Sequence, residues 1–186
     1  MKTLLSAVAL AALAVPAFAQ MANPMVGGAP MYADKTIVEN AVNSADHTTL
    51  VAAVQAAGLV DTLSGAGPFT VLAPTNEAFA ALPADTLAAL MQPQNKDRLT
   101  QILTCHVIPA EAFSSDIVGM IQADGGTHAI QTVGGCVLQA SLQNGMVAIT
   151  DEQGRTAHVT IADVDQSNGV IHVIDQVLLP SVASQQ

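Results

Sequence analysis

Apolar positions recur at two different spacings along the chain, and the change of spacing divides it into two halves. Between residues 36 and 104 the apolar residues return every three or four positions, which is typical of helices with one buried face. Between residues 128 and 174 they tend to alternate with polar residues, as in strands with one buried face. Helices followed by a mostly antiparallel group of strands predict an α+β domain.

Capping residues mark the starts of the predicted helices. Thr36 and Glu39 have the spacing of a capping box, which predicts a helix from there to about Val42. A second helix follows Asp46 and ends at Gly58, and Thr75 caps a third. Further helices are expected over residues 84–91 and 94–104, with a short extended segment over 59–63.

Turn signals separate the predicted strands, which cover residues 69–73, 128–133, 136–142, 146–150 and 156–161. Asn144-Gly145 is a strong two-residue hairpin signal between two of them. Asn168-Gly169 introduces a last apolar strand, which Pro180 terminates. In the 136–142 strand, alternation predicts one shared face for Cys136, Leu138, Ala140 and Leu142.

Residues 1–19 have the pattern of a secretory signal peptide: Lys2, an apolar stretch, and Ala17-Phe18-Ala19 as a cleavage site. The apolar stretch is shorter than the roughly 20 residues that a membrane span needs. The alternative to a cleaved signal peptide is an uncleaved N-terminal anchor. Residues 20–32 are rich in Met, Pro, Gly and Ala, which predicts a flexible linker. The expected domain covers 33–181, with a tail at 182–186, and its location is the periplasm, the cell surface or the exterior.

Charge narrows the range of partners. The chain carries five Lys and Arg against fifteen Asp and Glu, for a formal net charge of −10. Nucleic acid binding needs clustered cations, so this class is excluded, and anionic membranes are disfavoured for the same reason. No apolar segment beyond the leader is long enough to be a transmembrane helix. The partners compatible with this charge are neutral molecules, cationic molecules, or molecules that bind through bridging divalent ions.

The two cysteines, Cys105 and Cys136, are expected to form a disulfide, because an exported chain folds in an oxidising compartment. Closing this loop is worth about 3–4 kcal/mol by chain entropy. Two buried free thiols are the alternative. Neither cysteine has a second ligand at metal-binding spacing.

Three ordered motifs give the chain a resemblance to the fasciclin (FAS1) domain family. Residues 67–79, GPFTVLAPTNEAF, resemble its first signature motif, and 167–180, SNGVIHVIDQVLLP, resemble the second. The segment ILTCHVIP at 102–109 is similar to the family's central tyrosine–histidine motif. The resemblance implies a β-wedge of about seven strands flanked by several helices, and a non-catalytic role in adhesion.

The resemblance also points to candidate partner-binding residues. An Asp-Ile pair ahead of the second motif is implicated in integrin binding in animal members, and it maps here onto Asp163 and Val164. His106 belongs to the tyrosine–histidine motif, in which Cys105 replaces the tyrosine. The adhesive role proposed for that tyrosine therefore does not transfer, and a disulfide is expected to replace its structural contribution.

No catalytic constellation stands out, so the protein is predicted not to be an enzyme. His106 and His172 each lie on an apolar face, and a buried histidine bonded to backbone is the simpler interpretation than a ligand or base. A GxSxG nucleophile turn, a complete GxGxxG and an EF-hand pattern are absent from the sequence. Asp151-Glu152 is expected in a solvated turn, and no metal or cofactor is predicted.

Two functions follow. The first is an exported adhesion or interaction module that binds a protein or polysaccharide at a cell surface or matrix. The second is a periplasmic carrier or sensor that holds a small apolar ligand between the helices and the wedge, suggested by 51% hydrophobic residues with 3% aromatics. A purely structural matrix protein is a third possibility. Oligomeric state is left open.

Overall fold

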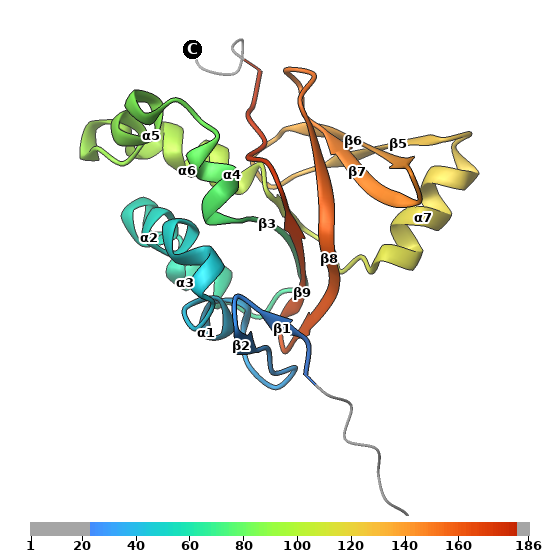
Figure 1. Cartoon of the computed structure of the whole chain (residues 1–186), viewed down its shortest axis with the longest axis horizontal. Coiled ribbons are helices and arrows are strands. Elements are labelled where there is room, and N and C mark those ends of the chain that lie inside the picture. Colours follow the sequence, from blue (N-terminus) through green and yellow to red (C-terminus); the bar gives the residue numbers. More distant parts are fainter. Residues whose placement is uncertain (1–22, 182–186) are drawn as a thin grey trace, which may run out of the picture.

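A mixed sheet of seven strands runs through the domain, and helices lie on both of its faces (Figure 1). The computed structural model of the chain describes residues 23–181. The central strands β3 and β9 are parallel, and the other neighbours are antiparallel. In the order in which they lie side by side, the strands are β4 (Val107–Ile108), β3 (Phe69–Pro74), β9 (Gly169–Ile174), β8 (Thr156–Gln166), β7 (Met146–Thr150), β6 (Val137–Gln143) and β5 (Thr127–Gln131).

Helices cover the two faces of the sheet at different places. Within residues 23–181, α7 (Ser114–Ala123) packs against β5, β6 and β7, whereas the other α-helices gather beside β3 and β9 (Figure 1). Single 3-10 turns precede α2 and α6, at Ala45–His47 and Pro93–Asn95. The helices beside β3 and β9 are α1 (Ile37–Ala41), α2 (Thr48–Ala57), α3 (Val60–Leu63), α4 (Asn76–Ala80), α5 (Ala84–Leu90) and α6 (Lys96–Thr104). This confirms the predicted α+β wedge.

Side-chain alternation along the central strands divides the core into two clusters. In β9, Ile171 and Val173 join the cluster under α1 to α6. Ile174 points to the other face and joins the cluster that contains Ile117 and Ile121 of α7. Both faces of β9 are therefore covered, which is why its sequence is apolar almost without interruption.

The capping signals read from the sequence are present. Thr36 and Glu39 form a reciprocal capping box at the start of α1. The Thr75 hydroxyl accepts a hydrogen bond from the Ala78 N–H at the start of α4. Gly58 ends α2 in the left-handed conformation, with φ of +72°.

Asn168, in the turn before β9, joins three parts of the helical half. Its Oδ1 accepts a hydrogen bond from the Ile37 N–H at 3.0 Å, and its Nδ2 donates to the carbonyls of Leu63 and Gly65. The next residue, Gly169, has φ of +149°, and a Cβ there would lie 1.9 Å from the Phe69 carbonyl oxygen. The pair Asn168-Gly169 therefore does more than turn the chain: it fixes α1 and α3 to the parallel strand pair.

Residues 23–32 differ from the predicted linker. β1 (Met25–Val26) and β2 (Ala29–Pro30) form a small antiparallel hairpin. Val26 and Met31 are buried against the core at 3% and 2% exposure, so burial of apolar side chains orders a segment whose composition suggested flexibility. The predicted signal peptide, residues 20–22 and the tail at 182–186 lie outside the described residues.

Three further elements differ from expectation. Residues 60–63 form helix α3 and not an extended segment. Helix α7 was not predicted from the sequence. Leu142, expected on the buried face of its strand, is 39% exposed, since it lies next to the hairpin turn at the end of the sheet. No helix in residues 23–181 has the length and apolarity needed to cross a bilayer.

Candidate functional site

Asp163 is exposed, but its carboxylate is engaged within the domain. Oδ1 accepts a hydrogen bond from the Ser114 N–H at 2.6 Å, and Oδ2 accepts one from the Ser114 hydroxyl. Ser114 is the first residue of α7, whose N-terminal N–H groups have no partner inside the helix. Asp163 therefore caps α7 from a strand that lies 49 residues away in the sequence.

The backbone around Asp163 is irregular. Pairing between β8 and β9 shifts in register between Ile161 and Val164, and Asp163 has φ of +59°. The irregularity lets Asp163 face outward while Val164 turns inward to 0% exposure. Val164 is thus packed in the core of the isolated domain, and its role as a partner contact stays a prediction.

His172 supports the same turn from inside. Its Nδ1 accepts a hydrogen bond from the Asp163 N–H at 3.2 Å, and its Nε2 donates to the Ala112 carbonyl at 2.8 Å. Both ring nitrogens are thus used, and burial lowers the pKa of His172. This is the buried, backbone-bonded histidine that the sequence suggested.

His106 has the opposite tautomer in the same kind of environment. Nδ1 donates to the Ile102 carbonyl at 2.8 Å, and Nε2 accepts from the Leu178 N–H at 2.9 Å. Burial lowers the pKa of His106 to about 4. At 2% exposure His106 is a core residue that holds the C-terminal segment against α6, and its role as a partner contact stays a prediction.

Cys105 and Cys136 are joined in a disulfide, as predicted. Cys105 follows the last residue of α6, and Cys136 directly precedes β6. The Gly134 N–H also donates to the Thr104 carbonyl at 3.0 Å, so the two segments are hydrogen-bonded beside the bridge. The disulfide thereby ties the helical half to the outer strands.

Asp151 is buried and not in the solvated turn that was predicted. Its carboxylate accepts hydrogen bonds from the Arg155 guanidinium, from the N–H groups of Gln153 and Arg155, and from the Leu179 N–H. These partners compensate for the loss of hydration. Asp151 therefore fixes the β7–β8 turn to the C-terminal segment, and both of its carboxylate oxygens are engaged in hydrogen bonds.

The described residues contain no group of three or more His, Cys, Asp and Glu side chains placed to hold a metal ion. His47 is buried, and its Nδ1 lies 2.8 Å from the Ser44 hydroxyl oxygen. His128 and His158 are paired with Asp124 and Asp175 respectively. These three histidines thus make separate contacts within the domain.

One face of the outer strands is uncovered and almost free of charge. Helix α7 packs on the side that contains Leu138 and Ile149, so most of the opposite side of β5 to β8 faces solvent, although Ala148 at its centre is buried at 0% exposure. We call this surface the open sheet face. Its exposed or half-buried side chains are Thr127, Ala129, Gln131, Val137, Gln139, Ser141, Gln143, Met146, Thr150, Thr156, His158 and Thr160.

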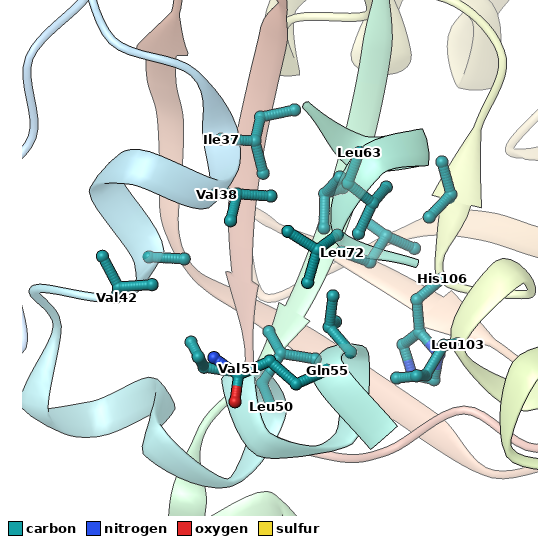
Figure 2. A pocket seen from close by; sticks show the side chains of 15 residues that line it. Ile37, Val38, Val42, Leu50, Val51, Gln55, Leu63, Leu72, Leu103 and His106 are labelled. Carbon is teal, nitrogen blue, oxygen red and sulfur yellow. The ribbon is translucent and has the colours of Figure 1, made fainter. Parts of the chain in front are cut away.

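A pocket of about 190 Å³ lies between α1 and α2, with β3 at its back (Figure 2). Val38 and Leu72 face it from α1 and β3, and Gln55 of α2 supplies the one side-chain amide. The His106 ring reaches it from beyond α6, but both ring nitrogens are already hydrogen-bonded. The remaining lining residues are Ile37, Ala41, Val42, Leu50, Val51, Val54, Val60, Leu63, Val71, Leu103 and Val107.

The seven-stranded mixed sheet, the helices on both faces and the three motifs define a fasciclin-type domain. The family model described as the fasciclin domain matches residues 45–180, and the chain belongs to this family. Membership supports an adhesion-type module.

Relatives and a solved structure agree with this assignment. The chain is 48% identical over 145 residues to Protein sll1483 of Synechocystis, covering 78% of this chain and 73% of that protein. It is 36% identical over 137 residues to transforming growth factor-beta-induced protein ig-h3 of Sus scrofa, covering 74% of this chain but 18% of that protein. A FAS1 domain pair from the insect cell adhesion molecule fasciclin I has the same fold, with a TM-score of 0.70 at 20% identity, over 78% of this chain and 51% of that one.

We did not predict the open sheet face from the sequence, and we placed a small apolar ligand only in general terms, between the helices and the wedge. The open sheet face had a signal, because the outward positions of residues 137–143 are Val, Gln, Ser and Gln, with no Asp, Glu, Lys or Arg among them. The pocket had no local signal, since its lining comes from five separate segments between residues 37 and 107.

Proposed function

We propose that the protein is an exported, non-catalytic adhesion module that docks on an uncharged partner through the open sheet face. The observation that carries this proposal is the chemistry of that face. On a chain with a net charge of −10, the strands β5, β6 and β7 contain no Asp, Glu, Lys or Arg. A surface of this kind neither attracts polyions nor repels neutral polymers.

A neutral polysaccharide of a cell surface or matrix fits this face best. Gln131, Gln139 and Gln143 offer amide donors and acceptors, and the Ser and Thr hydroxyls act as both, which matches the hydroxyl groups of sugars. Exposed Val137 and Met146 add apolar contact area. A twisted sheet presents these groups in parallel rows, which suits an extended polymer.

Export to the periplasm or the cell surface is part of the proposal. It is supported by the leader pattern of residues 1–19 and by the disulfide, since disulfides persist in oxidising compartments.

Attachment of the producing organism's cells to surfaces coated with the domain tests the proposal. Gln139→Glu places a charge at the centre of the open sheet face, between Ala129 and Thr150 in the paired strands. Gln122→Glu makes the same change on the exposed side of α7 and is the matched control. We expect Gln139→Glu and soluble neutral glucan to reduce attachment, and Gln122→Glu to leave it unchanged.

Two results would contradict this. Equal attachment to both variants would remove the open sheet face as the docking surface. If protease treatment of the cells abolished attachment and glucan did not affect it, the partner would be a protein and not a polysaccharide.

A second candidate function, a carrier or sensor of a small apolar ligand, is favoured by the pocket between α1 and α2 (Figure 2). Ligand bound to protein isolated from the producing cells, detected by native mass spectrometry, tests this function.

A further inference from the structure

We propose that the pocket between α1 and α2 binds a small neutral molecule with an apolar body and at most one hydrogen-bonding group. The inference defines the ligand class for the second candidate function and rests on it; it is independent of adhesion through the open sheet face.

The lining explains why the ligand is neutral. None of the residues around the pocket is Asp, Glu, Lys or Arg. A carboxylate or ammonium group entering it would lose water without gaining a counter-charge, which is strongly unfavourable. Short fatty acids and amphipathic cations, whose charged group has to enter the pocket with the apolar body, are therefore disfavoured.

The hydrogen-bonding capacity of the pocket is confined to its rim. His106 donates to the Ile102 carbonyl and accepts from the Leu178 N–H, so it offers only its ring surface to a ligand. Gln55 is exposed and retains its amide. One hydroxyl, carbonyl or ether oxygen at the end of an apolar body matches this arrangement.

The volume limits the size of the ligand. A dry apolar cavity of about 150 Å³ is enough to bind benzene, and this pocket has about 190 Å³. The occupant is thus a ring or a short chain, or the end of a longer apolar chain that leaves between the helices. Val42, 52% exposed at the end of α1, marks this exit.

The neighbours of α1 and α2 explain why the pocket stays open. Helix α1 is held by α3 and β9, whereas α2 packs on α6 and α4. Asn168 fixes both α1 and α3 through the Ile37 N–H and the Leu63 carbonyl. Because the two helices are anchored to different elements, neither is drawn across the space between them.

Titration with 1-octanol, followed by methyl NMR of the folded domain, tests this inference. We expect saturable shifts of the Leu50, Val51, Val54 and Leu103 methyl groups, and binding of octanoate at least about tenfold weaker because its carboxylate has no counter-charge. Ala41→Leu extends a side chain into the pocket and should weaken octanol binding at least about tenfold. Ala56→Leu, on the exposed side of α2, is the matched control and should bind like the parent.

The possible results distinguish ligand binding in the pocket from the carrier function in cells. Absence of saturable shifts in the unmodified domain, equal binding of octanol and octanoate, or unchanged binding in Ala41→Leu would each overturn the proposal. A doubled mass in light scattering that octanol does not reverse would identify a second copy of the chain as the occupant and overturn it too. Octanol binding as expected, with no ligand on protein isolated from cells, would support the site and refute the carrier function.

Discussion

Replacement of Asp163 separates a structural role from an adhesive one. The structure gives the carboxylate two hydrogen bonds from Ser114 at the start of α7, and it gives the Asp163 backbone a φ of +59°. Loss of a helix cap costs about 0.5–2 kcal/mol. A β-carbon without a polar side chain in this left-handed conformation costs about 1 kcal/mol more.

A series of three variants distinguishes the two contributions. Asp163→Ala loses the cap and also loses the polar side chain that makes this conformation tolerable, so we expect its free energy of unfolding to fall by about 1.5–3 kcal/mol. Asp163→Gly loses the cap but relieves the strain, and should lose about 1–2 kcal/mol. Asp163→Asn keeps one acceptor and tolerates this conformation, so its loss should be the smallest, below about 1 kcal/mol.

Urea unfolding followed by far-ultraviolet circular dichroism is the suitable assay, because the chain has no Trp and one Tyr. Hydrogen exchange would localise the change, with faster exchange expected in the first turn of α7. An Asp163→Ala variant as stable as the parent, with unchanged exchange in α7, would refute the capping role. If that variant also lost cell attachment, we would infer that Asp163 contacts the partner directly.

Three other changes test the internal framework. Burial lowers the pKa of His106 from 6.5 to about 4, so the neutral ring contributes fully to the free energy of unfolding above pH 6.5. This contribution is lost as the pH falls from 6.5 towards 4, by about 3 kcal/mol in total. Urea titrations should therefore show that the stability of His106→Gln falls less in acid than that of the parent, and equal pH profiles would refute this. Asn168→Ala leaves three backbone groups without their partners, so thermal unfolding should report a loss of about 2–4 kcal/mol, whereas a loss below about 1 kcal/mol would contradict its joining role. Cys105→Ser with Cys136→Ser removes the covalent loop and should cost about 3–4 kcal/mol in urea unfolding; equal stability of the double variant would exclude the chain-entropy estimate.

Local signals predicted much of the fold. The caps at Thr36 and Thr75, the hairpin at Asn144-Gly145 and the left-handed Gly58 act within a few residues, so their consequences can be read from neighbouring letters. The prediction for the segment with Val26 and Met31 was wrong because it used local composition, which suggests flexibility. The order of this segment comes from burial against residues that are distant in the sequence.

The candidate site was less predictable, because its contacts are made at long range. A motif locates Asp163 on the chain, but nothing near it indicates that its partner is Ser114. The buried state of His106 followed from its place at the end of an apolar stripe, whereas the hydrogen bond from Leu178 did not. The pocket depends on α1 and α2 being held by different neighbours, and such a tertiary relation has no counterpart in local spacing.

Amide NMR of the isotope-labelled domain, titrated with cellohexaose and with dextran oligomers, tests the proposed docking surface most directly. We predict saturable shifts centred on Gln139, Ser141 and Thr150 of the open sheet face, and their loss in Gln139→Glu. Shifts centred on Asp163, or no shifts with either neutral glucan, would contradict it.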